Sequence, residues 1–155
     1  MENNVKGIIA QVAEVQLTYK SKVSAKDRPI VRSSAECYLL LRQIWDDSSL
    51  ELFESFKVLY LNRANQVLCF YPLSTGGMTG TLADPRLVFM TALKVAACNL
   101  ILCHNHPSGN LQPSQSDIDL TEKILNAGKL LDIRVLDHVI ISAEGYYSFS
   151  DEGLI

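Results

Sequence analysis

Residues 99–117 of this chain read NLILCHNHPSGNLQPSQSD, and the fold can be inferred outward from them. The run from Asn99 to Cys103 is short, continuous and apolar, which is typical of a strand buried on both faces of a sheet. Pro107 and Gly109 end that strand, and a helix from about Ser114 to Leu130 follows the polar loop. A buried strand that leads through a short loop into a helix indicates an α/β fold.

The two ends of this loop carry two histidines and a carboxylate. His104 and His106 are two residues apart at the end of the strand, and residues i and i+2 of a strand point to one face. Both imidazoles are therefore expected to converge on one point, with Asn105 turned away. Asp117 falls in the first turn of the next helix, where the helix dipole favours a carboxylate. Two histidines and one aspartate leave one position open on a tetrahedral cation, which is the pattern of catalytic zinc sites.

Simpler interpretations of these residues stay open. Two neighbouring histidines also suit a plain hydrogen-bonded pair, and Ser114 followed by Asp117 also suits an ordinary helix N-cap. Glu54 favours the metal site, because a carboxylate on an apolar strand face is costly unless it is paired or bound to a cation. That face is expected to carry Leu52, Phe56, Val58 and Tyr60 as well. Exposure near the start of the strand is the alternative for Glu54.

The rest of the chain alternates between strand and helix patterns. The predicted elements are a strand over 15–19, a helix that begins after Ser33 with Glu36 in a capping box, a hairpin of strands over 52–61 and 67–71, a helix from Asp84-Pro85 to about 97, a strand over 134–142 and a last hairpin at 144–145. This alternation predicts an α/β fold, a mixed β-sheet with helices packed on it. We divide the chain into an N-terminal strand and helix extension over 1–47 and a metal-binding domain over 48–155, and expect one compact unit.

Composition places the chain among globular proteins. Its 155 residues are 48% hydrophobic and 20% charged, which suits one domain. No apolar run approaches the roughly 20 residues that span a bilayer, and the opening MENNVKG lacks the features of a secretory signal. We therefore expect a cytoplasmic protein that does not engage membranes. The four cysteines form no CxxC pair and are expected to be buried, reduced thiols.

Charge argues against DNA binding as the main activity. The formal net charge is -3, whereas binding to phosphates needs a basic face. The densest positive cluster is modest and lies in a predicted loop, where a solvated surface is the better interpretation: Lys20, Lys22, Lys26, Arg28 and Arg32. Nucleic acid stays a candidate partner that the charge does not support.

The candidate catalytic and metal-binding residues follow the spacing of a known motif. Glu54, then His104-x-His106, seven residues, Ser114, two residues and Asp117 resemble the JAMM (MPN+/JAB) metalloprotease motif. The string HNHPSG followed by PS-x-x-D, with DPR earlier and LDH later, is similar to RadC-family JAB domains in particular. The resemblance covers roughly residues 48–155, and the helix before them also resembles short RadC-like proteins. The helix-hairpin-helix region of longer RadC proteins has no counterpart in this sequence, which weakens any DNA-repair role taken from the family name.

This resemblance implies a fold, a cofactor and an activity. The implied fold is the deaminase-like (JAB/MPN) α/β sandwich, and the implied cofactor is one Zn²⁺ ion bound by His104, His106 and Asp117. Glu54 is implied as the general base that holds the attacking water, and Ser114 as a support for the oxyanion. The implied activity is JAMM-type, zinc-dependent hydrolysis of peptide or isopeptide bonds, with a protein or peptide as substrate.

For three other residues near the motif, a structural role is the favoured interpretation. His138 lies on a predicted strand and is expected to be a packed core histidine, with a supporting role near the metal as the alternative. Asp137 faces the other way and is expected to cap or orient a loop. Cys103 precedes His104 and should point to the opposite face, so it is not counted as a ligand.

Other functions fit parts of the pattern. The main alternative is a RadC-like binding module with a metal site, associated with DNA repair or a mobile element. Two histidines and a carboxylate also describe non-haem iron oxygenases, but no cosubstrate site is evident. The letters HNH suggest a ββα-metal nuclease, but the HPSG loop offers no further phosphate ligands. The substrate, the oligomeric state and any regulatory partner are not named by the sequence.

Overall fold

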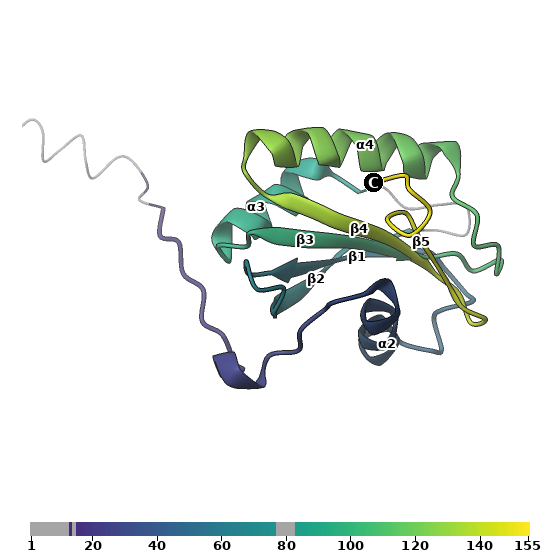
Figure 1. Cartoon of the computed structure of the whole chain (residues 1–155), viewed down its shortest axis with the longest axis horizontal. Coiled ribbons are helices and arrows are strands. Elements are labelled where there is room, and N and C mark those ends of the chain that lie inside the picture. The colour runs from purple at the N-terminus through teal and green to yellow at the C-terminus, as the bar shows by residue number, and fades with distance from the viewer. Residues whose placement is uncertain (1–12, 14, 77–82) are drawn as a thin grey trace, which may run out of the picture.

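The computed structural model describes residues 13, 15–76 and 83–155 (Figure 1). Its elements are η1 (Ala25–Asp27), α2 (Ser34–Ile44), β1 (Ser55–Leu61), β2 (Val67–Thr75), α3 (Pro85–Lys94), β3 (Asn99–Asn105), α4 (Gln115–Leu130), β4 (Arg134–Ile141) and β5 (Tyr146–Ser148). The predicted alternation of strands and helices is thus confirmed from residue 34 onward.

Five strands form one mixed sheet in the order β2-β1-β3-β4-β5. Neighbouring strands are antiparallel except β3 and β4, which run parallel. Helix α4 connects this parallel pair, because two parallel strands need a long crossover connection. β3 lies in the middle of the sheet and every residue in it is buried, as its apolar sequence predicts.

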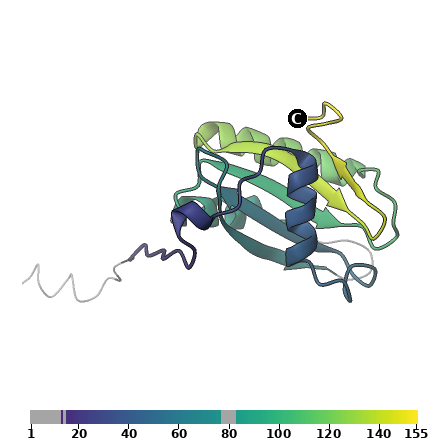
Figure 2. The same ribbon diagram turned by 60° about the horizontal axis from the view of Figure 1, so that its bottom comes forward.

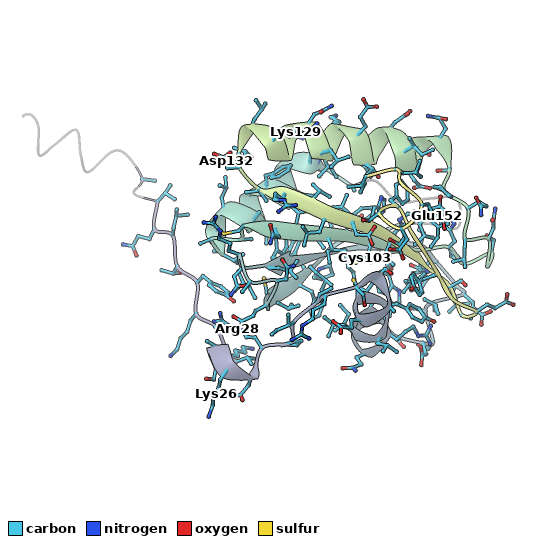
Figure 3. The ribbon with its side chains drawn as sticks, viewed as in Figure 1. Lys26, Arg28, Cys103, Lys129, Asp132 and Glu152 are labelled. Atoms are coloured by element: carbon cyan, nitrogen blue, oxygen red, sulfur yellow. The ribbon has the colours of Figure 1, made fainter. Side chains whose placement is uncertain are left out.

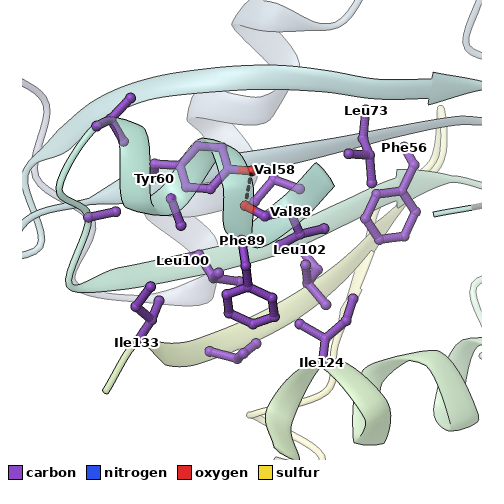
Figure 4. Packing of buried hydrophobic residues seen from close by; sticks show 14 residues of the cluster. Phe56, Val58, Tyr60, Leu73, Val88, Phe89, Leu100, Leu102, Ile124 and Ile133 are labelled. Atoms are coloured by element: carbon purple, nitrogen blue, oxygen red, sulfur yellow. Dashed lines mark hydrogen bonds between the residues drawn. The ribbon is translucent and has the colours of Figure 1, made fainter. Parts of the chain in front are cut away.

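Helices cover both faces of the sheet, with α3 and α4 on one side and α2 on the other (Figures 1 and 2). On the α3 and α4 side, the buried cluster contains Phe56, Tyr60, Phe89 and Ile124 (Figure 4). The Tyr60 hydroxyl in this cluster donates a hydrogen bond of 3.0 Å to the Val88 carbonyl, which ties β1 to α3. Alternate residues of β1 face opposite layers, so this arrangement is the predicted α/β sandwich.

The second cluster lies between the sheet and α2. It contains Leu41 and Trp45 from the helix region and Ile101 and Cys103 from β3. Figure 3 shows Cys103 directly above α2, on the opposite side of the sheet from α4. Its thiol donates to the Lys57 carbonyl at 3.0 Å, so the prediction that Cys103 points away from the metal candidates is confirmed.

Each long helix begins at a residue whose side chain accepts a backbone hydrogen bond. Ser33 accepts from the amide of Glu36 at the start of α2, and Asp84 accepts from the amide of Arg86 at the start of α3. These side chains satisfy amide groups that have no partner within the helix. Both predicted helix starts are confirmed, although α3 ends at Lys94 rather than near residue 97.

Two strand predictions are wrong. Residues 15–19 form no strand, and Val15 and Leu17 are 81% and 76% exposed. Tyr19 contacts β2 through its hydroxyl, but residues 15–18 lead away from the sheet, so the alternating pattern has no neighbouring strand to pair with (Figures 1 and 2). β1 begins at Ser55 rather than at residue 52, and Leu52 is exposed instead of sharing the buried face of the strand.

The basic residues predicted to form a solvated surface lie beside this segment. Lys26 and Arg28 are at or next to η1, on the side of the molecule away from α4 (Figure 3). Across the described part of the chain, no helix combines the length and apolar character needed to cross a bilayer. Residues 1–7, on which the expectation about a secretory signal rests, lie outside the described residues.

Candidate metal centre

The two histidines lie at the carboxyl end of β3, in the middle of the sheet. His104 is the sixth of seven buried residues in β3 and its side chain is fully buried, whereas the side chain of His106 is 15% exposed. The two Nε2 atoms are 2.9 Å apart. Asp117, from the first turn of α4, places Oδ1 3.3 Å from the Nε2 of His104 and Oδ2 3.7 Å from the Nε2 of His106. Strand, loop and helix therefore bring the three predicted ligands together.

The spacing of these ligand atoms can be compared with that of a tetrahedral zinc site, although the closest contact between His106 and Asp117 is longer, at 3.7 Å. Zinc bonds of about 2.0–2.1 Å place neighbouring ligand atoms about 3.3 Å apart in a tetrahedron. The separation of 3.3 Å between His104 and Asp117 matches this value, and the separation of 2.9 Å between the two Nε2 atoms needs only a small adjustment. One atom from each of the three residues lies within 4.8 Å of the others. Among the described residues they form a candidate group of metal ligands.

Ser114 and Asp117 also form the N-terminal cap of α4. The Asp117 carboxylate accepts from the amide and the hydroxyl of Ser114, at 2.7 and 2.6 Å, through Oδ2. The Ser114 hydroxyl accepts from the amide of Asp117 in return. The N-cap interpretation is therefore correct, and it is compatible with metal binding because Oδ1 remains directed toward His104. The cap fixes the Asp117 carboxylate through Oδ2 and leaves Oδ1 facing His104.

Burial and neighbouring charges set the protonation of this cluster. Burial lowers the pKa of His104 to about 4, so that ring is neutral near pH 7. The neighbouring Asp117 carboxylate, 3.7 Å away, raises the pKa of His106. Burial alone would raise the pKa of Asp117, but the neighbouring His106 and His104 rings and the hydrogen bonds from Ser114 outweigh it and hold that pKa far below its usual range. Asp117 is therefore an anion at neutral pH, as a metal ligand must be.

Glu54 lies at the mouth of this cluster, just before β1. In the β1–β3 register Phe56 is opposite His104, so continuing that register brings Glu54 opposite His106. Glu54, His106 and Ser114 line one open hollow of about 380 Å³. The negative charge of Glu54 contributes to the raised pKa of His106. The structure therefore brings Glu54 and Ser114 to the same opening as His106, and Glu54 sits just before the strand rather than within it.

Asn105 has a structural role that the sequence analysis missed. Its side chain points to the opposite face from the histidines, as predicted, and there donates to the carbonyls of Leu50 and Phe53 at 2.7 and 3.0 Å. Its Oδ1 accepts from the amide of Ser55 at 2.8 Å. These bonds grip the backbone on both sides of Glu54. A polar residue in a buried strand requires such partners, which is the signal that could have identified it.

His138 and Thr121 lie next to the candidate ligands on their buried side. His138 is fully buried, and its Nε2 lies 2.8 Å from Nδ1 of His104. The packed core position predicted for His138 is therefore correct. Thr121 of α4, which the sequence analysis did not single out, lies 2.6 Å from the Nδ1 of His138. Asp137 accepts from Ser148 and from the amide of Ser150, which confirms that it orients a loop.

Comparison with known protein families gives a match over most of the chain. A model of the RadC-like JAB domain family matches residues 31–154, which include α2 and the whole sheet. The chain belongs to the RadC-like JAB domain family. The resemblance found in the sequence motif is thereby confirmed.

Several RadC-like relatives carry the name UPF0758 protein. The one from Flavobacterium johnsoniae is 47% identical over 124 residues, which cover 80% of this chain and 53% of that protein. The one from Rubrobacter xylanophilus is 38% identical over 128 residues, covering 83% and 55% of the two chains. The one from Methanosarcina mazei is 44% identical over 102 residues, covering 66% and 44%. The chain thus spans about half the length of the curated relatives it matches.

Proposed function

We propose that this RadC-like domain is a JAMM-type zinc hydrolase that cleaves peptide or isopeptide bonds. The observation that carries the proposal is the convergence of His104, His106 and Asp117 beside an open hollow that His106, Glu54 and Ser114 line. Two imidazoles and one carboxylate are a donor set that suits zinc and leaves a position for water. A binding module with a structural metal would have no need of a carboxylate and a hydroxyl at the open side.

The residues divide the chemistry among them. His104, His106 and Asp117 would hold the ion, and zinc bound there would lower the pKa of water to about 7 and polarise a carbonyl. Glu54 accepts the proton of the attacking water and returns it to the leaving amine, as a general base and then a general acid. The Ser114 hydroxyl donates to the developing oxyanion. When it does so, Asp117 keeps the hydrogen bond of 2.7 Å from the Ser114 amide, so the cap survives the reaction.

The test combines metal content with turnover of the full chain. Purified protein is loaded with zinc, its metal content is measured by mass spectrometry, and it is incubated with ubiquitin-like fusion proteins and peptide libraries. Glu54→Gln should keep stoichiometric zinc and lose about 10²–10⁴-fold in rate, because only the base is removed. His106→Ala should lose both zinc and turnover.

Glu51→Gln is the matched control, because Glu51 is an exposed acid three residues before Glu54. This variant should keep both zinc and turnover. Full activity of Glu54→Gln would show that the base is assigned wrongly. Stoichiometric zinc without hydrolysis, together with DNA binding that weakens steeply with salt, would favour the binding-module alternative.

A further inference from the structure

A chain of hydrogen bonds runs from Asp117 through Thr121 and His138 to His104. We propose that Thr121 and His138 are positioning residues that fix the tautomer of His104, so that its Nε2 presents a lone pair to the cation. This inference rests on the proposed metal site and concerns how the protein prepares that site before the ion arrives.

Thr121 determines which atoms donate and which accept along this chain of hydrogen bonds. Its hydroxyl donates to the backbone carbonyl of Asp117, one helical turn earlier, at 2.6 Å. A carbonyl can only accept, so the single hydroxyl proton of Thr121 is used there. The Oγ1 of Thr121 also lies 2.6 Å from the Nδ1 of His138. Thr121 must therefore accept from this nitrogen, and His138 carries a proton on Nδ1.

His138 passes the direction on to His104. The ring of His138 is fully buried, stacked 4.7 Å from the ring of Phe149 and tilted 5.5 Å from that of Phe56. A cation in this apolar setting is costly, so the ring holds one proton and its Nε2 is an acceptor. The Nδ1 of His104 lies 2.8 Å from that Nε2 and donates to it. His104 then has no proton on Nε2, the atom that lies 3.3 Å from Asp117.

A fixed hydrogen-bond acceptor also places the proton on the ring of His106. The Nδ1 of His106 lies 2.5 Å from the carbonyl of Asn110, to which it can only donate. In the neutral ring, Nε2 then carries the lone pair, and this atom faces the Nε2 of His104 at 2.9 Å. Metal-binding histidines usually donate their other ring N–H to a fixed acceptor, and loss of that acceptor typically costs about 10–100-fold in metal affinity. For His104 the acceptor is another histidine, and that histidine is itself held by the helix that carries Asp117.

The first measurement is zinc affinity, determined by competition with a chelating dye on metal-free protein. Thr121→Val removes the hydroxyl at nearly constant volume, and His138→Phe keeps an aromatic ring without an acceptor. Both should weaken zinc binding by about 10–100-fold, while Thr121→Ser should retain it. Cys103→Ala is the control: it alters a buried residue next to His104 on the other face and should leave zinc affinity unchanged. Circular dichroism confirms that each variant is folded.

The second measurement reads the tautomers without metal. Long-range ¹H–¹⁵N correlation of metal-free protein should show His104 and His138 protonated at Nδ1, and Thr121→Val should mix the tautomers of both rings. Folded Thr121→Val and His138→Phe with unchanged zinc affinity would overturn the proposal, as would a wild-type His104 protonated at Nε2. Failure of the wild type to bind zinc would instead contradict the proposed function, and the tautomer spectrum would still decide this inference.

Discussion

At the scale of single residues, the candidate centre depends on imidazoles that are kept neutral by burial. Burial lowers the pKa of His104 to about 4 and that of His138 well below 6.5. Their rings stack against phenylalanine rings, so water does not solvate a charge on them. Neutral rings keep lone pairs available to a cation, but holding them neutral makes the metal-free protein sensitive to acid.

We therefore expect metal-free protein to lose stability as the pH falls from about 6.5 toward 4. In this window the unfolded chain binds protons on these histidines before the folded protein does, which lowers the free energy of unfolding by up to about 1.4 kcal/mol per pH unit for each. The raised pKa of His106 does not offset this loss, because its stabilising contribution is complete below 6.5 and is lost only as the pH rises. Urea unfolding in the presence of a chelator measures the profile.

His138→Phe provides the comparison for this profile. The variant lacks one of the two depressed histidines and should therefore show a shallower decline over the same pH range. A wild-type profile that is flat between pH 4 and 6.5 would contradict the inferred neutrality of the buried rings.

At the scale of the elements, successive residues at the end of β3 make contacts on opposite faces of the sheet. His104 and His106 present ring nitrogens to α4, while Asn105 between them grips the segment 50–55. One tripeptide thus places the candidate ligands and anchors the backbone that carries Glu54. The cap of α4 likewise serves the helix and the carboxylate together.

Asn105→Ala should destabilise the protein by about 2 kcal/mol or more, because it leaves two carbonyls and one amide without their partner. Hydrogen exchange should accelerate selectively in residues 50–55. Asn99→Ala is the matched control at the other end of β3, where the side chain of Asn99 donates to Asn62 and Asn65. That variant should loosen residues 62–65 and leave 50–55 protected. Equal exchange at 50–55 in both variants would show that Asn105 does not anchor the segment.

At the scale of the whole molecule, stability resides in the sandwich and not in the segment before it. Leu41 of α2 is fully buried in the second cluster, whereas Leu17 is 76% exposed. The Tyr19 hydroxyl donates to the Leu68 carbonyl of β2 at 2.9 Å, but the apolar side chains at 15 and 17 remain in solvent. The two leucines therefore test which part of the chain forms the folded core.

Leu41→Ala should lower the free energy of unfolding by about 2–5 kcal/mol, because it leaves a cavity between α2 and the sheet. Leu17→Ser should change it by less than about 0.5 kcal/mol, as is usual for exposed positions. Chemical denaturation monitored by Trp45, which is buried beside α2, measures both. A large loss of stability in Leu17→Ser would show that residues 15–19 pack in solution, contrary to the structure.

Much of the fold could be predicted because its signals are local. Ser33, Asp84 and Ser114 mark helix starts through bonds to amides two or three residues away, and the apolar run 99–103 marks the central strand. The spacing of His104, His106 and Asp117 within one strand, loop and helix likewise identifies the candidate ligands. In these cases the interacting groups are near one another in the chain, so their spacing is nearly enough to specify their contact.

Tertiary structure decided the rest, because those contacts join residues far apart in sequence. Asn105 meets Leu50 across 55 positions, and His104 meets His138 across 34, so both depend on which strands are neighbours and in what register. The strand expected at 15–19 shows the converse. An alternating pattern makes a strand possible, but the strand forms only where another strand supplies hydrogen bonds, and none of the described strands pairs with this segment.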